Sequence, residues 1–544
     1  MKNLNKLIAT VLIGSTLVGC NDLDAVYEGF YVTNDQKAAT LEAKPELALA
    51  GVTAIASTAV HFMSIYADNH GDFGIPALLI GMDSQGTDML SRNVGYNWFQ
   101  EYEALSGFDS SGLGPNIMWL TLYQQINSAN SVLVNIPADT ENAEMQMYRA
   151  QALGYRAFDY WMLAQNYQIN YYGHENLPCV PIITEENMEV AANEGCARST
   201  TEEVYAQILS DINNAIALAE KSQVSVSQLI DSKPRRMLSL DAMYGLRARI
   251  YLTMHKYAEA AADADKAISL SSCTPYSIEE VSHPSFTSLN DHSWMWGIAI
   301  AETDRVVTSG IVNFPSHICS FAYGYVTVGA WRGTNAKLFN AIPESDVRRG
   351  WFLDENFHSD NLTEEQEAYL KSYGTGSVKD TGSGIFPYVN VKYDSYNSVL
   401  NQNTNASDIP LMRIEEMYYI KAEGLAMSGQ VAQGLEVLTN FEKTYRNPDF
   451  STKAATAEEV QELIWNKRRL EFWGEGLSWL DLKRLNKGID RRGLGFPAAY
   501  VYNVKPDTEE ESWVYALPHT EVLYNDKINE NNREMSRPPV IAED

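Results

Sequence analysis

Residues 244–270 read YGLRARIYLTMHKYAEAAADADKAISL and carry aromatic and small side chains at the spacings of a tetratricopeptide helix pair. The side chains at these spacings are Tyr244, Ala248, Tyr251, Tyr257, Ala260, Ala264 and Ala267. Small alanines allow two helices to approach closely, and the aromatic rings fill the gaps between them. The stretch therefore predicts two closely packed helices.

A second copy of this pattern lies near the C-terminus and reproduces the same offsets. It consists of Tyr418, Ala422, Leu425, Val431, Gly434, Leu438 and Phe441. Because the two copies are far apart in the chain, they do not form a simple tandem array. The insertion between them, about 272–409, is rich in Gly, Ser, Asn, Tyr and Trp and has only short strand-like runs such as 325–328. We expect this insertion to be irregular.

Periodic apolar residues also predict helices over 116–135 and 144–165, joined near Pro137 as a hairpin. Ser and Thr followed by acidic residues at 199–203 predict the start of a further helix. The predicted fold is therefore mainly α, a tetratricopeptide-type helix-pair scaffold with a large irregular, loop-rich region. Loops on a rigid scaffold commonly carry binding function, so we expect the ligand to bind in that region.

The N-terminus predicts export and lipid attachment. Lys2 and Lys6 precede an uncharged apolar run, 7–18, which is too short to span a bilayer and is typical of a signal peptide. The run ends at Leu17-Val18-Gly19-Cys20, which resembles the lipobox of bacterial lipoproteins. We expect 1–20 to be the signal peptide and Cys20 to carry the lipid, including a palmitate-type acyl chain. The alternative is an ordinary cleaved signal peptide with an incidental cysteine.

Composition restricts the function further. The chain has 544 residues and a net charge of −29, so phosphate would be repelled and nucleic acid is not an expected partner. Four cysteines remain after Cys20, namely Cys179, Cys196, Cys273 and Cys319. No CxxC pair is present, so a zinc site is not expected. A disulfide between Cys179 and Cys196, or buried free thiols, are both compatible with the sequence.

The acidic residues include one candidate for an active site. Asp83 and Asp88 form a candidate carboxylate pair of the glycosidase type, but in a chain with 70 acidic residues such pairs arise by chance. The sequence contains no Gly-x-Ser-x-Gly elbow, no phosphate-binding glycine loop with lysine, and no HExxH. We therefore predict a protein that is not an enzyme, with no catalytic residues, no metal site and no cofactor; a calcium site is left open.

Aromatic residues in the loop-rich regions are better candidates for function. Exposed Trp and Tyr rings stack on the apolar faces of sugar rings, while neighbouring polar groups bind the hydroxyls. The candidate ligand-binding residues are Tyr96, Trp98, Trp294, Trp296, Tyr323, Tyr325 and Trp331, with Asp88, Arg92 and Arg332 as polar partners. For any single Trp, burial in the core is the competing interpretation.

The C-terminal third carries the most specific resemblance. Residues 411–426 resemble the motif LRxAExYLxxAEAL, and residues 468–484 resemble ERRxELxxEGxRxxDLxR. These motifs, with a closing segment at 517–525, resemble the SusD/RagB family of nutrient-binding outer-membrane lipoproteins. Asn466 and Ser478 depart from the second motif, where the family usually has Glu and Arg. We expect the charged residues of this motif to form buried ion pairs, with Ser478 leaving a carboxylate such as Glu475 or Asp481 in need of another partner.

The resemblance implies a cell-surface lipoprotein that captures an oligosaccharide and delivers it to a SusC-like TonB-dependent outer-membrane transporter. It implies an anchor in the outer membrane, with the protein facing the cell exterior. The expected regions are a signal peptide (1–20), an N-terminal SusD-like region (21–225), a helix pair (226–271) and a C-terminal RagB/SusD region (272–544) that includes the insertion (272–409). Alternatives are peptide capture by a member of the same family, a glycoside hydrolase, and a purely structural scaffold.

Overall fold

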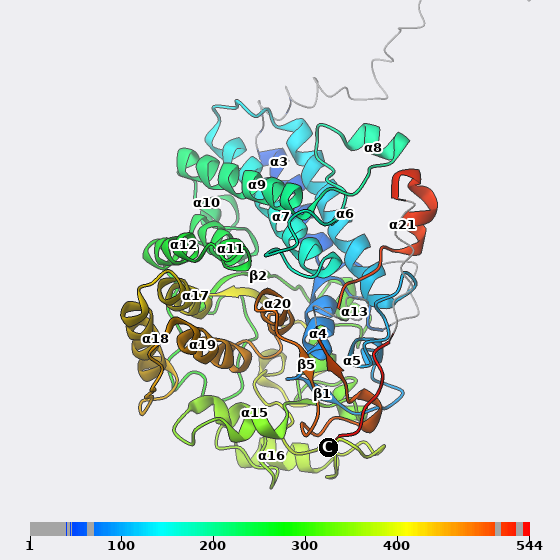
Figure 1. Ribbon diagram of the computed structural model, residues 1–544, viewed down its shortest axis with the longest axis vertical. Helices are drawn as coiled ribbons and strands as arrows, with labels where there is room; N and C mark the ends of the chain where they lie inside the picture. Colours follow the sequence, from blue (N-terminus) through cyan, green and yellow to red (C-terminus); the bar gives the residue numbers. More distant parts are fainter. Residues whose placement is uncertain are drawn as a thin grey trace, which may run out of the picture.

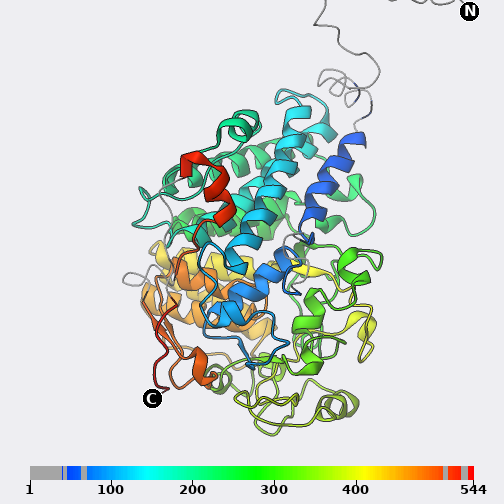
Figure 2. The same cartoon turned by 90° about the vertical axis from the view of Figure 1, so that its right-hand side faces the viewer.

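The computed structural model describes residues 40, 44, 46–62, 70–505, 513–528 and 537–543. The predicted signal peptide and Cys20 lie outside these ranges. The described part is mainly helical, as predicted, with helices gathered in one half and irregular chain in the other (Figures 1 and 2). None of the helices in these ranges is long and apolar enough to cross a membrane.

The N-terminal part of the scaffold is built from long helices. They are α3 (Glu46–Thr58), α4 (Ile75–Gln85), α6 (Leu113–Asn135), α7 (Ala143–Tyr167) and α9 (Thr201–Ser222), with the short α5 (Gln100–Glu103), α8 (Met188–Glu194) and α10 (Val226–Leu229) between them. The predicted hairpin is formed by α6 and α7, and the predicted capping box at the start of α9 is present at Thr200 and Glu203. Its side-chain and backbone bonds satisfy amide groups that have no partner inside the helix.

The two tetratricopeptide-like pairs lie side by side in space. They consist of α11 (Leu240–Thr253) with α12 (Tyr257–Leu270), and of α17 (Ile414–Met427) with α18 (Val431–Tyr445). A Cβ atom at Gly424 of α17 would stand 2.5 Å from the Tyr257 carbonyl oxygen at the start of α12, and one at Gly434 of α18 would stand 2.5 Å from the Ala422 oxygen. The small residues therefore permit the close contact within a pair that the sequence pattern predicted, at Gly434, and also a contact between the two pairs, at Gly424, that it did not predict.

A short antiparallel ladder explains how the pairs can be neighbours. Strand β2 (Trp294–Ile298) pairs with β4 (Ile409–Arg413), with Trp294 opposite Arg413 and Ile298 opposite Ile409. The chain between these strands thus leaves and re-enters the scaffold at one place, as Figure 1 shows beside α17. The predicted insertion is a long excursion that leaves the two helix pairs in contact.

The excursion itself is largely irregular, as predicted. Its helices are α13 (Arg305–Thr308), α14 (Phe314–Ile318), α15 (Ala336–Asn340) and α16 (Glu364–Lys371), and β3 (Arg332–Gly333) pairs with β1 (Leu90–Ser91) from the N-terminal region. The expected strand-like run at 325–328 is wrong, because Val326–Val328 is a 3-10 turn. Gly329 follows it at φ +114°, and the Ala330 amide donates to the Tyr325 carbonyl, which closes the turn.

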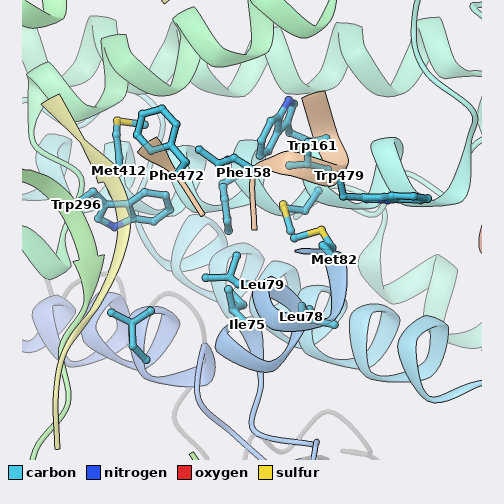
Figure 3. Close-up of a cluster of buried hydrophobic side chains, with 14 of the residues drawn as sticks. Ile75, Leu78, Leu79, Met82, Phe158, Trp161, Trp296, Met412, Phe472 and Trp479 are labelled. Atoms are coloured by element: carbon cyan, nitrogen blue, oxygen red, sulfur yellow. The ribbon is translucent and has the colours of Figure 1, made fainter. Parts of the chain in front are cut away.

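The chain ends with elements that cover the scaffold and reach back to the N-terminal region. They are α19 (Ala457–Glu471), α20 (Ser478–Arg484), β5 (Ile489–Asp490) paired with β6 (Asn503–Val504), and α21 (His519–Tyr524). Figure 3 shows α4 side chains, among them Ile75 and Met82, in a buried cluster with Trp161 of α7, Trp296 of β2 and Trp479 of α20. The core therefore joins elements from the whole described chain.

The predicted buried ion pairs of the C-terminal motif are confirmed. Glu471 on α19 accepts from three arginines, with N–O distances of 2.7 to 3.1 Å. These arginines are Arg348, Arg413 and Arg446. Burial of charge is costly unless every group is paired, so the network fixes how the insertion, β4 and α19 fit together. Asp481 pairs with Arg468 and Arg484, both at 2.7 Å.

The cysteines of the described chain are free. Cys179 is buried and burial raises the pKa of its thiol to about 12, while Cys196 is half-buried and lies 3.7 Å from the Ile182 carbonyl oxygen. Of the two alternatives that the sequence left open, the structure shows free thiols.

Candidate functional site

Two loop segments distant in sequence meet in an aromatic cluster. His70 and Trp98 come from the N-terminal region, and Tyr325 comes from the insertion. The ring centroids of His70 and Trp98 are 4.8 Å apart, and Trp98 meets Tyr325 edge-on at 6.4 Å. The Tyr325 hydroxyl is hydrogen-bonded to Nδ1 of His70. The cluster therefore holds the two loops together through both ring contacts and a polar bond.

Two exposed tyrosines flank this cluster in the chain. Tyr96 is 56% exposed and lies two residues before Trp98, and Tyr323 is 48% exposed and lies two residues before Tyr325. We name the set of five residues the aromatic patch: His70, Tyr96, Trp98, Tyr323 and Tyr325. Trp98 is half-buried and Tyr325 is buried, so Tyr96 and Tyr323 are the tyrosines of the patch whose rings are exposed to a ligand.

A buried column of rings supports the patch from below. His317 of α14 stacks on Tyr325 at 4.5 Å on one side and on Phe73 at 5.4 Å on the other. Burial, and next the charge of Arg332, lower the pKa of His317 well below its usual range, so the ring is neutral. Its Nε2 atom lies 3.0 Å from the His70 carbonyl oxygen, which ties the column to the patch.

Neither histidine was predicted as a site residue. A lone histidine in a loop carries no pattern that distinguishes it, and the residues that give His70 and His317 their roles lie about 250 residues away in the chain, as the separations of 255 and 247 in their hydrogen bonds show. The available signal was the aromatic content of two loop-rich regions, from which Trp98 and Tyr325 were named as candidates.

Arg332 does not reach the surface, and the prediction that it binds ligand is corrected. The side chain is buried and pairs with Glu103 at 3.2 Å, while Nε donates to the His317 carbonyl at 3.0 Å and Nη2 donates to Asn97 at 3.1 Å. A guanidinium that is already neutralised and bonded in the core has no donor left for a sugar. It positions the loops of the patch from inside.

Arg92 and Trp331 also have a positioning role in place of the predicted ligand contact. The Arg92 guanidinium donates to the carbonyls of Ser377 at 2.9 Å and Gly382 at 2.6 Å, and also to that of Gly384. Trp331 is fully buried and its Nε1 donates to Ser383 at 2.7 Å. The two side chains therefore hold the 374–384 loop against both segments of the patch.

The remaining predicted contacts belong to the core. Trp294 and Trp296 of β2 have no exposed surface, since Trp296 packs edge-on against Phe158 of α7 at 4.9 Å. Asp88 is buried and pairs with Arg469 through Oδ1. Sequence composition does not distinguish a Trp ring that faces solvent from one that faces the core. In the structure, both Trp rings of β2, which pairs with β4, lie in the core.

The carboxylate pair considered for catalysis is inaccessible as well. Asp83 lies in the last turn of α4, not in a loop, and its Oδ2 accepts from the Gly476 amide at 3.1 Å. Burial raises the pKa of Asp83 to about 7, with a smaller contribution from the nearby charge of Asp88. Neither carboxylate lines any of the cavities described below.

Three cavities lie elsewhere on the described chain. One cavity of about 570 Å³ lies between α3 on one side and β2 with the chain that follows it on the other. A second of about 510 Å³ lies between α7, α9 and residues 184–186, and its charged groups are already paired, Arg156 with Asp211 at 2.7 Å. A third of about 180 Å³ lies beside the 374–384 loop. Among the described residues, no three His, Cys, Asp or Glu side chains gather as metal ligands.

Comparisons with known proteins agree with this architecture. Residues 76–252 match a family described as "Starch-binding associating with outer membrane", and residues 322–540 match one described as "SusD family". The chain is similar to SusD-like protein P2 of Formosa agariphila, with 22% identity over 459 residues that cover 78% of this chain and 81% of the relative.

Two solved structures show the same fold. A SusD-like carbohydrate binding protein from Bacteroides vulgatus superposes with a TM-score of 0.70 at 20% identity, covering 90% of this chain and 98% of that chain. Surface glycan-binding protein A from Bacteroides thetaiotaomicron, solved in complex with laminarihexaose, superposes with a TM-score of 0.62 at 15% identity, covering 90% and 99%. At these identities, the shared property is the fold.

Proposed function

Because the chain belongs to the SusD/RagB family, we propose that it is a cell-surface lipoprotein that captures an oligosaccharide at the aromatic patch. It then delivers the oligosaccharide to a SusC-like TonB-dependent transporter in the outer membrane. The family is one of glycan-binding proteins, and relatives of this fold bind laminarin and laminarihexaose. The identity of the sugar is a separate question.

The observation that carries this proposal is the pair of exposed tyrosines on a rigid aromatic base. Tyr96 and Tyr323 present their rings from two different loops, and the loops are fixed by the contact of Trp98 with Tyr325. Sugar rings have apolar faces that stack on such aromatic surfaces, and a preorganised base reduces the entropy lost on binding. The site needs no movement of the core to accept a ligand.

The anchor and the transporter complete the proposal. Cys20 carries the lipid, so the protein stays near the membrane, and a tether raises the effective concentration of a captured ligand at the transporter. The proposal includes no catalytic step, because Asp83 and Asp88 are buried and bonded within the fold. Replacement Cys20→Ala should leave binding in solution unchanged and impair uptake by cells.

The direct test is a binding screen of the full-length protein in detergent. Isothermal titration against neutral glucans such as laminarihexaose, other polysaccharides and a peptide panel measures the ligand class. Binding of at least one glycan, lost in a Tyr96→Ala, Tyr323→Ala double variant, supports the proposal. Binding of peptides alone makes this a peptide-capturing member of the family, and glycan binding that survives the double variant places the site elsewhere.

A further inference from the structure

The 570 Å³ cavity between α3 and the chain after β2 has the features of a built binding site. Its floor is aromatic and buried, with Tyr155 and Phe158 of α7 against Trp296 of β2. Trp296 meets Phe158 edge-on at 4.9 Å and Tyr155 at 5.6 Å, so the floor is rigid. Its rim is exposed and polar, and it includes Ser57, His61, Glu302 and Arg305. An apolar floor with a few convergent polar groups is the usual composition of a ligand pocket.

One wall of this cavity is held in a strained conformation. Lys233 has φ +49°, in the left-handed region that side chains with a Cβ atom rarely adopt. Its Nζ atom pairs with Asp408 at 2.6 Å and donates to the Ile300 carbonyl at 2.9 Å, and Asp408 also accepts from the Ile300 amide at 2.7 Å. Strained residues that neighbouring bonds hold in place gather at functional sites. Lys233 directly precedes the 3-10 turn Pro234–Arg236, which carries Arg236.

Two arginines on the cavity lack an acidic partner within the described chain. Arg236 donates from Nη2 to the Ser232 carbonyl at 2.8 Å, and its Nε atom is buried without a bond. Arg305 lies over the Phe62 ring at 4.8 Å. Other arginines of the described chain without a carboxylate partner, such as Arg92 and Arg235, donate from their guanidinium groups to carbonyls of distant segments. Both guanidinium groups line the same cavity.

The two acids of the lining, Glu302 and Asp304, accept from neutral donors of the same lining. Glu302 accepts from the Tyr396 hydroxyl at 2.9 Å, and Asp304 accepts from the Ala301 amide at 2.8 Å. Two polar atoms of the floor, Oε1 of Gln125 and Nε1 of Trp296, also have no hydrogen-bond partner among the residues that the structure describes. The lining therefore combines two guanidinium groups without a carboxylate partner in the described chain with two carboxylates held by neutral donors, and the guanidinium groups match an anionic group of a ligand.

We propose that the cleft between α3 and residues 296–306 binds an acidic saccharide, whose carboxylate or sulfate group is held by Arg236 and Arg305. This inference rests on the proposed glycan capture and adds a second glycan site, apart from the aromatic patch, together with the charge class of the ligand that it takes. Arginine presents a planar fork that matches the oxygens of carboxylate and sulfate in two parallel bonds. Saccharide hydroxyls match the polar rim, and the pyranose ring matches the apolar floor.

The test uses the full-length protein and an oligogalacturonate as the uronate probe, with a sulfated laminarin oligosaccharide as the sulfate probe. Isothermal titration should show binding of at least one acidic probe, and the Arg236→Gln, Arg305→Gln double variant should bind it at least about tenfold more weakly. The matched control is Arg235→Gln, because Arg235 donates to the Asp291 carbonyl, lies outside the cavity, and removes one charge.

The outcomes separate this inference from the proposed function. If neither acidic probe binds, or if the double variant binds as tightly as the natural protein, the inference is wrong. The proposed glycan function still stands in that case if laminarihexaose or another neutral glycan binds and Tyr96→Ala weakens this binding. Loss of all glycan binding in the natural protein would remove both. Unchanged thermal unfolding of the double variant confirms that folding is intact.

Discussion

Ser478 Oγ donates to Asp88 Oδ2 at 3.1 Å, at a position where the SusD/RagB signature usually carries arginine. The carboxylate that needs another partner is therefore Asp88, since Glu475 is paired with Arg413 and Lys392, and Asp481 is paired as well. The missing charge is supplied by Arg469, whose Nε donates to Asp88 at 2.8 Å. Glu475 and Asp481, the two carboxylates named in the prediction, both have charged partners in the structure.

Replacement of Arg469 by alanine should lower the free energy of unfolding by about 3 kcal/mol, because it leaves the buried Asp88 carboxylate without its charged partner. Urea unfolding followed by tryptophan fluorescence measures this change. Arg492→Ala is the matched control, since Arg492 forms an exposed pair with Asp490 and its loss should change stability little. Equal effects of the two substitutions would mean that Asp88 is stabilised by other groups.

Some elements of the fold could be predicted from the sequence, and others could not. The α11–α12 pair was predictable because its alanines and tyrosines repeat at helical spacing, and the partner α17–α18 repeats them. Their adjacency in space was not predictable, because it depends on the β2–β4 ladder that closes the insertion. Two short strands far apart in sequence carry no local signal that they pair.

The site was predictable only in part, for a related reason. Tyr96 and Tyr323 were expected to be exposed and are, whereas Trp294, Trp296 and Trp331 were expected in the site and lie in the core. Aromatic content marks both a stacking surface and a packed interior, and only the three-dimensional partners distinguish them. The sequence therefore localised the loops but not the face that each ring presents.

Tyr96→Ala and Tyr323→Ala should each weaken binding of the captured glycan by about tenfold, corresponding to ~1.4 kcal/mol. Each removes a ring face, while Trp98 and Tyr325 remain in place below. Tyr96→Phe keeps the ring and should bind nearly as well as the natural protein. The control is Tyr524→Ala on α21, which removes a ring that is 82% exposed and lies outside the patch. A Tyr524 variant that loses binding would move the site toward α21.

Arg92→Ala should loosen the 374–384 loop, because one guanidinium donates to three of its carbonyls. Hydrogen exchange should accelerate at the amides of Gly376 and Ile385, which bond across the base of this loop. Exchange in α16 should stay unchanged and serves as the internal control. Loop exchange in Arg92→Lys should lie between that of the natural protein and that of Arg92→Ala, since an ammonium group cannot reach three acceptors in one plane. If hydrogen exchange in the loop is unchanged in Arg92→Ala, then Trp331 and not Arg92 keeps the loop in place.

Asp83→Asn should stabilise the protein relative to its natural form as the pH rises. Burial raises the pKa of Asp83 from its ordinary value near 3.8 to about 7, so the folded protein holds a proton that the unfolded chain releases. The natural protein therefore loses stability between about pH 4 and pH 7, by up to ~1.4 kcal/mol for each pH unit, and no further above that range. Asparagine has no such proton to release, so Asp83→Asn does not lose stability in this way as the pH rises.

Urea unfolding of both proteins at pH 5 and pH 7.5 measures the difference between them. From pH 5 to pH 7.5, the difference in free energy of unfolding between Asp83→Asn and the natural protein should shift in favour of the variant by about 2 kcal/mol or more. Asp139→Asn is the control, since Asp139 is exposed and its substitution should give the same difference at both pH values. A constant difference for Asp83→Asn would show that the Asp83 carboxylate is already ionised in the folded protein at pH 5. The Gly476 amide would then stabilise the charge against the cost of burial.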